Sequence, residues 1–340
     1  MCQTGAIIGM GGMGIRHFEA LKNANIKVVG ICDVNQIKLD SYVNSDIECH
    51  TDYKSLIDSL GITLDILCIV TNTPYRYKVC EYAIKKGVKC ILMEKPFTSS
   101  LEEAYSLINL SNKYGTRIGV NVYRRVSENH IKLNDFIKSS GMGEVRHISI
   151  HCASTGFGNM GSVFFDLMNF YANSDPSDVT GYIDNTGTPS LRGPEFIDPG
   201  GYGLVNYKNG VRGIIDISED TGVPYTFHIV TTYGRIFIEE AQDKWNIYCR
   251  NKEGLFAPLT QYYRELYEIP FDLSHNWDVV YLTAEAIRQL ISDKEITFNV
   301  SNATTVMEMI TGFHASNNQG HVPVRLPLDK SFHKMKFSFA

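Results

Sequence analysis

Long apolar runs are missing from this sequence of 340 residues. No stretch of about 18 consecutive apolar residues occurs, so we expect no membrane-spanning helix and no membrane partner. The first residues, Met1-Cys2-Gln3-Thr4-Gly5, lead directly into a strand-like pattern and lack the charged and apolar regions of a signal peptide. The sequence therefore predicts a cytoplasmic protein.

A surplus of basic residues is also missing. Lys and Arg number 32 against 37 Asp and Glu, which gives a net charge of -5. Proteins that bind nucleic acids carry Lys and Arg that neutralise the phosphate backbone. We therefore expect no nucleic-acid partner.

Cysteine patterns that bind metals are missing as well. The sequence has eight cysteines, but none forms a Cys-x-x-Cys pair or has the spacing of zinc ligands. Cys32, Cys68 and Cys90 lie within or at the end of apolar strand patterns. We predict buried free thiols in a reducing compartment, and no metal site.

Strand and helix patterns alternate over the first 120 residues. The expected strands are residues 6–9, 27–32, 65–70, 89–94 and 116–122, and the expected helices are residues 13–23, 75–86 and 101–113. Ser99 or Ser100 is expected to cap the third helix. This alternation predicts an N-terminal Rossmann domain, residues 1–122, with a doubly wound parallel sheet.

Strand patterns dominate after residue 125. A helix at 128–138 precedes expected strands at 145–152, 179–183, 203–207, 211–218, 227–232, 235–239 and 245–249. Helices follow at 277–292 and 303–317. The sequence thus predicts a C-terminal α/β domain, residues 123–340, with a large, mostly antiparallel open sheet, giving an α/β plus α+β fold class overall. Its last helices and tail are expected to pack back on the Rossmann domain.

A glycine-rich turn links the first strand to the first helix. It reads Gly9-Met10-Gly11-Gly12-Met13-Gly14 and fits G-x-G-x-x-G. In such a turn the first glycine permits the sharp bend, the second lets a pyrophosphate approach the backbone, and the third lets the helix pack on the strand. The start of the helix then offers free N–H groups to the phosphates. The turn predicts a dinucleotide site.

Asp33 ends the second expected strand, 19 residues after Gly14. An acidic residue at this place binds the ribose hydroxyls of NAD and would repel the 2′-phosphate of NADP. NAD is therefore the expected cofactor. Arg16 keeps NADP as an alternative, and a second alternative is that Asp33 only caps the following segment.

Several short motifs together resemble the Gfo/Idh/MocA oxidoreductases. They are residues 7–17, Thr73-Pro74, Gly87, Glu94-Lys95-Pro96 and residues 141–145, and the resemblance covers nearly the whole chain. It implies a Rossmann domain, a second domain whose open sheet commonly forms an oligomer interface, and hydride transfer at a sugar, inositol or nucleotide-sugar carbon. We therefore expect a homo-oligomer, a dimer or tetramer, with a sugar or nucleotide-sugar substrate.

The resemblance places Lys95 at the nicotinamide and the substrate, and Thr71, Asn72 and Glu94 at the cofactor. A lysine there can hold a substrate hydroxyl and stabilise a developing alkoxide. If it is desolvated, it can also act as a base. The alternative is a solvated surface lysine, but the carboxyl end of a parallel strand is where such folds bind ligands.

A second family motif, Asp-x-Gly-x-His-x-x-Asp, is matched only in part, by residues 159–166. Gly161 and Asp166 fit, but Asn159 stands at the first aspartate and Val163 at the histidine. A shifted register would place Asn169 at the histidine position. In both registers the expected histidine is missing, and the resemblance leaves Asn159, Val163 and Asp166 as the substrate contacts.

Loss of that histidine leaves three readings, because hydride transfer at a carbinol carbon needs a partner for the hydroxyl proton. Lys95 acts as the base itself, another group replaces the histidine, or catalysis has been lost. The weak candidates for a replacement are Tyr123, His130, His151 and His275.

Tyr123-Arg124-Arg125 follows the last Rossmann strand, at a hinge that borders the substrate in the family. The two arginines bind an anionic part of the substrate or pair with acidic residues at the surface. Two functions therefore remain open. The first is an NAD(P)-dependent dehydrogenase or reductase acting on CH–OH groups, and the second is a non-catalytic NAD(P)-binding regulatory protein of the same fold.

Overall fold

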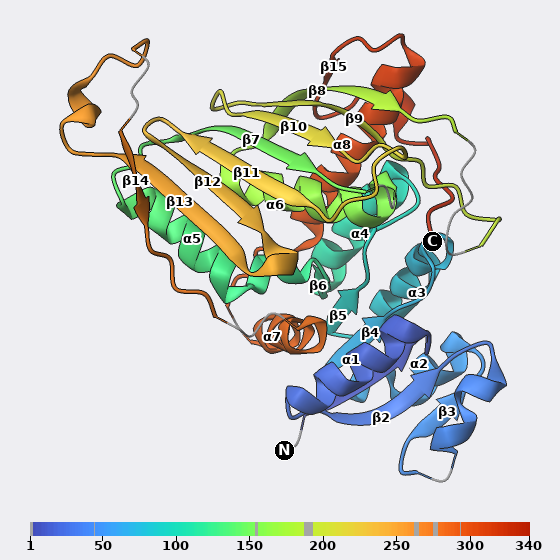
Figure 1. Cartoon of the computed structure of the whole chain (residues 1–340). Helices are drawn as coiled ribbons and strands as arrows, with labels where there is room; N and C mark the ends of the chain where they lie inside the picture. The colour runs from blue at the N-terminus through green and yellow to red at the C-terminus, as the bar shows by residue number, and fades with distance from the viewer. Residues whose placement is uncertain are drawn as a thin grey trace. The chain divides into compact units, whose positions relative to one another are not determined.

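The computed structural model describes residues 3–43, 45–153, 156–186, 193–261, 265–274, 278–292 and 294–340. The chain forms two compact units, each with its own sheet (Figure 1). Unit 1 consists of Met1–Ser127, Asn276–Met307 and His333–Ala340, and unit 2 of Glu128–His275 and Glu308–Phe332.

Unit 1 contains a sheet of six parallel strands in the order β3-β2-β1-β4-β5-β6. All residues of β4 are buried and apolar, as expected for a central strand covered on both faces. The strand order reverses at β1 and β4, which confirms the predicted doubly wound Rossmann fold. The strands are β1 (Thr4–Ile8), β2 (Lys27–Cys32), β3 (Glu48–His50), β4 (Ile66–Ile69), β5 (Cys90–Met93) and β6 (Arg117–Val120).

The helices of unit 1 are α1 (Gly12–Asn23), α2 (Tyr53–Leu60), α3 (Thr73–Lys85), α4 (Leu101–Tyr114) and α7 (Val279–Ile291). Ser100, rather than Ser99, caps α4: its hydroxyl accepts the Glu103 N–H at 3.3 Å, and the Glu103 carboxylate accepts the Ser99 N–H at 3.0 Å. This arrangement resembles a capping box, except that the carboxylate binds the N–H of the residue before the N-cap. The short elements β3 and α2 were not predicted: β3 has only three residues, and α2, although amphipathic, has only eight.

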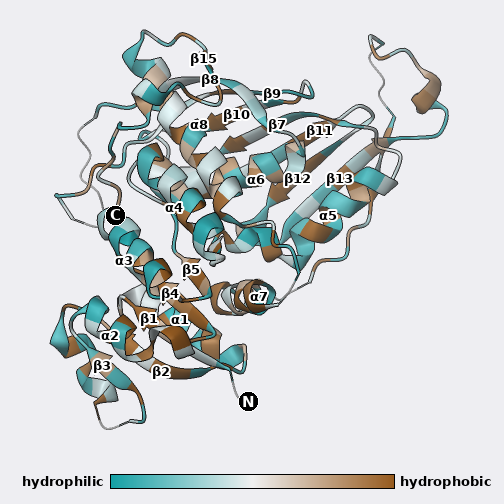
Figure 2. Ribbon diagram, turned by 180° about the vertical axis from the view of Figure 1, so that it is seen from behind, coloured by the Kyte–Doolittle hydropathy of each residue, from teal (hydrophilic) through white to brown (hydrophobic). Residues whose placement is uncertain are grey.

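Helix α7 completes the core of unit 1 although it follows the first segment of unit 2 in the sequence. Its Leu282, Ile287 and Leu290 are buried in the same apolar cluster as Ile7 and Leu92 of the parallel sheet. The last residues of the chain also belong to this unit, where Thr73 donates its hydroxyl to the carbonyl of Ala340 at 2.6 Å. Figure 2 shows the apolar colouring concentrated on the central strands of this sheet.

Unit 2 contains a nine-stranded sheet in the order β14-β13-β12-β11-β7-β10-β9-β8-β15. Strands β7 and β10 are parallel, and the other pairings among the described strands are antiparallel, so the predicted large, mostly antiparallel sheet is confirmed. Its strands are β7 (Val145–His151), β8 (Pro176–Ile183), β9 (Gly201–Tyr207), β10 (Arg212–Asp216), β11 (Thr226–Thr231), β12 (Gly234–Glu239), β13 (Lys244–Arg250), β14 (Leu266–Ile269) and β15 (Val324–Arg325).

Helices α5 (Glu128–Ser139) and α6 (Ser162–Ala172) lie on one face of this sheet, and α8 (Val300–Asn318) runs from unit 1 into unit 2 (Figures 1 and 2). The other face is open, since every second residue of β9 is exposed. Tyr202 and Leu204 are among these exposed side chains. In the described part of the chain, no helix has both the length and the apolar character needed to cross a membrane.

Candidate cofactor and active site

The glycine turn between β1 and α1 has the geometry that the sequence predicts. Gly9 has φ +100°, and a Cβ there would lie 2.7 Å from the carbonyl oxygen of Val70. A Cβ at Gly14 would collide with the carbonyl oxygen of Gly9. These two positions need glycine for the fold itself.

Gly11 and Gly12 have a different environment. A Cβ at either position would meet no atom within 4 Å, so the backbone here borders open space. Gly11 is the N-cap of α1, and no side chain caps that helix end. The first N–H groups of α1 therefore face this space with the positive end of the helix dipole behind them, which fits the pyrophosphate of a dinucleotide.

Asp33 follows β2 and is 7% exposed. Its Oδ2 accepts the Met10 N–H of the glycine turn at 2.8 Å and the Lys38 ammonium at 3.0 Å, while its Oδ1 accepts the Asn35 N–H at 2.9 Å. The carboxylate thus does shape the following turn, which was the alternative to a cofactor role. A carboxylate has about four acceptor positions, so capacity for a ribose hydroxyl remains.

Thr71 and Asn72 lie between β4 and α3. The Thr71 hydroxyl is buried and has no hydrogen-bond partner among the described residues. Asn72 is the N-cap of α3, but its side chain makes no capping hydrogen bond. A hydroxyl without a partner costs free energy when it is buried, so this pair is suited to a bound group at the carboxyl edge of the sheet.

Lys95 is the second residue after β5 and is half-buried. Its main-chain N–H donates to the Oε2 of Glu94 at 3.2 Å. Lys95 therefore lies at the carboxyl end of a parallel strand, as predicted, and is not a fully solvated surface lysine.

Glu94 is the centre of a buried polar network within unit 1. Its Oε1 lies 2.8 Å from the Nε2 of His17 on α1 and accepts the Asn121 amide, also at 2.8 Å. Asn121, after β6, also donates to the Thr283 hydroxyl of α7 at 3.2 Å. Four elements of the unit thus meet at one carboxylate.

Both charges of the His17–Glu94 pair are retained in the buried network. Burial by itself lowers the pKa of His17, but the neighbouring Cys68 and Glu94 side chains raise it to about 10. Burial by itself raises the pKa of Glu94, but hydrogen bonds from His17 and Asn121 and the charge of Lys95 hold it at about 2. The pair is therefore an ion pair at neutral pH.

Arg76 on α3 is a further buried charge, and it contacts the residue after Lys95. It is 4% exposed, and it donates to the carbonyl of Thr71 at 2.8 Å and to the carbonyl of Pro96. Burial lowers its pKa to about 10, and it remains charged at neutral pH. Sequence reasoning missed His17 and Arg76, since a histidine or arginine inside a helix gives no signal of burial.

Tyr123, Arg124 and Arg125 form a short 3₁₀ turn after β6. Both arginines are buried, so the reading of them as surface residues is wrong. Arg124 donates to the Tyr123 hydroxyl at 3.2 Å, and its guanidinium lies 5.2 Å from the centre of the Tyr123 ring. These contacts are confined to unit 1.

The second motif lies in unit 2, on a π-helical turn, Phe157–Gly161, that continues into α6. Asn159, Val163 and Asp166 are spaced by four and three residues and share one helix face. Val163 and Asp166 are buried, and the Asn159 N–H donates to Asp198 at 2.8 Å. Asn169, the histidine position of the shifted register, accepts the Tyr207 hydroxyl at 2.9 Å.

The histidines that were considered as replacements have separate surroundings. His130 is buried in unit 2, with Nδ1 2.8 Å from the Tyr171 hydroxyl and Nε2 3.2 Å from Glu240. His151 is exposed in β7, and His275 lies outside the described residues. Occupation of both ring nitrogens favours a structural role for His130.

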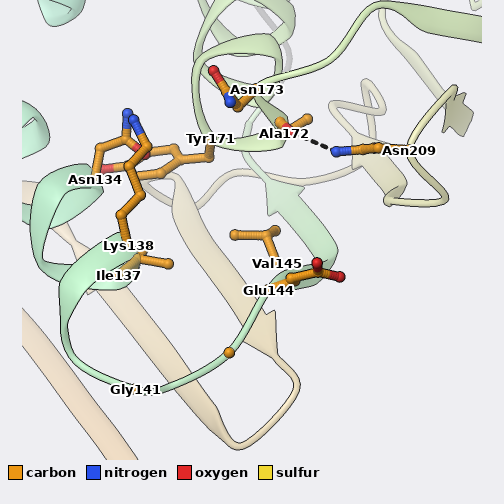
Figure 3. A pocket seen from close by; sticks show the side chains of 11 residues that line it. Asn134, Ile137, Lys138, Gly141, Glu144, Val145, Tyr171, Ala172, Asn173 and Asn209 are labelled. Carbon is orange, nitrogen blue, oxygen red and sulfur yellow. Dashed lines mark hydrogen bonds between the residues drawn. The ribbon is translucent and has the colours of Figure 1, made fainter.

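A hollow of about 550 Å³ with a mixed polar and apolar lining also lies in unit 2 (Figure 3). Asn134 and Lys138 of α5 and Tyr171 of α6 line it, together with Asn173 and Asn209. The Asn209 amide is already engaged, since it donates to the carbonyl of Ala172 at 2.9 Å. Among the described residues that line this hollow, none is predicted to contact the cofactor or the substrate.

Unit 1 thus has the fold and the phosphate-binding turn of a nicotinamide-dinucleotide domain. Residues 4–122 match the GFO_IDH_MocA family model, described as an oxidoreductase family with an NAD-binding Rossmann fold. The match covers only the Rossmann domain and bears out the resemblance to the Gfo/Idh/MocA oxidoreductases there, and NAD is the cofactor of this domain.

Two curated relatives are similar to the chain. UDP-N-acetylglucosamine 3-dehydrogenase of Acidithiobacillus ferrooxidans is 32% identical over 143 residues, 42% of this chain and 42% of the relative. The uncharacterized oxidoreductase YrbE of Bacillus subtilis is 24% identical over 239 residues, 64% of this chain and 68% of the relative. The chain therefore matches less than half the length of the first relative.

Solved structures share the fold over nearly the whole chain. An NAD-binding oxidoreductase from Klebsiella pneumoniae has a TM-score of 0.79 at 15% identity and covers 97% of this chain and 100% of its own. The WlbA dehydrogenase from Bordetella pertussis, solved with NADH and UDP-GlcNAcA, has a TM-score of 0.75 at 16% identity and covers 97% and 100%. At this level of identity the similarity shows the fold alone.

Proposed function

We propose that this chain is an NAD-dependent dehydrogenase or reductase that transfers a hydride to or from a carbinol or keto carbon of a sugar or nucleotide-sugar. The observation that carries this proposal is the half-buried Lys95 at the carboxyl end of β5, in a chain that is 32% identical over 143 residues to a nucleotide-sugar dehydrogenase.

The cofactor is held by unit 1 in this proposal. The uncapped start of α1 and the open backbone at Gly11 and Gly12 receive the pyrophosphate, with Met13 in the first turn, and Asp33 receives the adenosine ribose. Thr71, Asn72 and Glu94 line the strand ends towards the nicotinamide. NAD supplies the acceptor or donor of the hydride.

Lys95 is the proposed catalytic residue. Its neutral amine accepts the hydroxyl proton when the alcohol is oxidised, and its ammonium returns that proton when the ketone is reduced. This role follows from Val163, because valine cannot exchange a proton where the family has histidine. Asn159 and Asp166 of unit 2 are the proposed substrate contacts, and Arg124 and Arg125, with Tyr123, are proposed to bind an anionic group such as a diphosphate.

A homo-oligomer formed through the open face of the nine-stranded sheet is part of the proposal. The exposed Tyr202, Leu204 and Phe237 give that face an apolar character that a partner copy would cover.

One observation favours a second candidate function. The buried, apolar Val163 at the histidine position is what a regulatory protein that binds NAD without catalysis would show. The intact Lys95 argues for the enzyme, because a binding protein has less need of that lysine.

Hydride transfer itself is the test. The purified protein is mixed with NAD or NADH and a panel of free and nucleotide-linked sugars, including UDP-N-acetylglucosamine, and the nicotinamide absorbance is followed. We expect turnover with at least one nucleotide-sugar, and its loss in Lys95→Met. Lys89→Met, an exposed lysine just before the same strand, is the matched control and is expected to retain turnover. Tight NADH binding without turnover across the panel would overturn the enzyme proposal in favour of the regulator.

A further inference from the structure

Two buried charged side chains hold the main chain on either side of Lys95, and neither belongs to its strand. On one side His17 of α1 binds Glu94 Oε1 at 2.8 Å, and Glu94 Oε2 accepts the Lys95 N–H at 3.2 Å. On the other side Arg76 of α3 donates to the carbonyl of Pro96. The peptide unit that ends in the Lys95 N–H and the peptide unit that begins with the Pro96 carbonyl are therefore both held by ionic groups.

Packing alone does not require charges here. His17 is 0% exposed, and Glu94 and Arg76 are each 4% exposed. Well-packed apolar residues commonly replace a buried ion pair without loss of stability, because the pair must overcome the desolvation of both charges. A buried set of charges that converges on one short segment is better explained by the geometry that it imposes on that segment.

The same two side chains are also linked to the segments that are proposed to bind the cofactor. His17 lies one turn beyond Gly14 on the helix that begins at the phosphate-binding turn. Arg76 donates to the carbonyl of Thr71 at 2.8 Å as well as to Pro96. Each therefore links one cofactor-binding segment to the segment that carries Lys95.

We propose that His17 and Arg76 are positioning residues for Lys95, His17 acting through the Glu94 carboxylate and Arg76 through the Pro96 carbonyl. This inference rests on the proposed function for the role of Lys95, but the geometry that it predicts exists without substrate. The network sets the distance between the lysine side chain and the cofactor-binding site. A misplacement of the reacting groups by about 1 Å costs on the order of 10²-fold in rate.

Amide hydrogen exchange in the cofactor-free protein tests the positioning without any turnover. The readout is the exchange rate of the Lys95 N–H relative to the Leu67 N–H in the central strand β4, which reports opening of the whole sheet. His17→Leu and Arg76→Met are expected to speed Lys95 exchange at least about tenfold more than Leu67 exchange, since a hydrogen bond to a charged group is lost or loosened. Leu107→Ala, a cavity in α4 away from the network, is expected to speed both alike.

Two further variants separate positioning from general destabilisation. His17→Gln keeps an N–H that can reach Glu94 and is expected to restore protection of the Lys95 amide. Adding Glu94→Gln to His17→Leu removes the unpaired carboxylate, so the double variant is expected to lose less stability than the two single changes together. If His17→Leu does not fold, Arg76→Met provides the same comparison.

Equal acceleration of the Lys95 and Leu67 amides in His17→Leu and Arg76→Met would overturn the proposal. Once a substrate is found, both variants are expected to lose on the order of 10²-fold in kcat with less than about tenfold change in NADH affinity. Selective loosening of Lys95 with no turnover even in the wild type would support the positioning and overturn the dehydrogenase function, so the two failures are distinguishable.

Discussion

Asp33 Oδ2 binds Met10 and Lys38 at the same time, with the Met10 N–H at 2.8 Å and the Lys38 ammonium at 3.0 Å. One carboxylate therefore fixes the phosphate-binding turn and also holds a lysine at the place where the adenosine ribose is proposed to lie. Lys38 is a positive charge beside the proposed ribose site that sequence reasoning, which considered only Arg16, did not identify.

Replacing Asp33 is expected to change the choice of cofactor. In Asp33→Ser the carboxylate no longer binds a ribose hydroxyl or repels a 2′-phosphate, and Lys38 is released to bind that phosphate. We expect NADH affinity to fall by about 10–100-fold and the ratio of NADPH to NADH affinity to rise. Nicotinamide fluorescence titrations measure both constants, with Lys38→Met added to Asp33→Ser as the control that removes the gain. An unchanged ratio would show that Asp33 serves only the turn.

The phosphate-binding turn contains glycines beside open space and glycines in close backbone contact, and this difference leads to a second prediction. Gly11→Ala is expected to retain the thermal stability of the wild type, because its Cβ would meet no atom within 4 Å, but to lose NADH binding, because that Cβ would lie where the pyrophosphate approaches. Gly14→Ala is expected to lose about 1–3 kcal/mol of stability through its collision with Gly9.

Gly222→Ala is the matched control for Gly11→Ala, since it adds a Cβ in equally open space in unit 2. Thermal unfolding and NADH titration of the three variants check both parts of the prediction. Normal NADH affinity in Gly11→Ala would place the pyrophosphate elsewhere.

The His17–Glu94 pair makes stability depend on pH. The pKa of His17 is raised from 6.5 to about 10 on folding, so its contribution is complete below pH 6.5 and is lost as the pH rises through about 10. The pKa of Glu94 is lowered from 4.5 to about 2, so its contribution is present above pH 4.5 and is lost as the pH falls through about 2.

Between pH 6.5 and about 8.5 we therefore expect the free energy of unfolding to fall with a slope of up to about 1.4 kcal/mol per pH unit, and His17→Gln to lose this slope. Higher pH is avoided because burial raises the pKa of the Cys32 thiol to about 12, so ionisation of unfolded cysteine would add its own effect. His314→Gln is the control, since burial lowers the pKa of His314 to about 4. Urea unfolding at a series of pH values measures the slopes, and equal slopes in wild type and His17→Gln would contradict a charged His17.

The open face of the nine-stranded sheet leads to a prediction about assembly. Leu204 is 48% exposed on β9 and Phe237 is 39% exposed on β12. If a partner copy covers this face, Leu204→Arg places a charge in the interface and is expected to shift a dimer or tetramer towards the monomer. Ile62→Arg, at a residue that is 74% exposed in unit 1, is the control. Light scattering over a range of concentrations gives the masses, and a monomeric wild type at every concentration would contradict the proposed oligomer.

Much of the fold could be predicted because its signals are local. The strand β2 was predicted with its bounds, since an apolar run ends at Asp33, and the glycine turn was recognised from its spacing. The edge elements β3 and β14 were missed because strands of three and four residues are too short to give a recognisable alternating pattern. In the candidate site, Glu94 and Lys95 were found through a motif, whereas His17 and Arg76 depend on contacts between segments distant in sequence, which no local pattern encodes.

The place of α7 in the core of unit 1 has a consequence for how the chain is made. A ribosome adds roughly 5–20 residues per second, so the first 127 residues are complete well before Leu282, Ile287 and Leu290 exist. During that interval the nascent chain exposes the apolar surface that α7 later covers. An isolated fragment of residues 1–122 would keep this surface permanently uncovered and is expected to aggregate, whereas a chain that includes α7 can bury it.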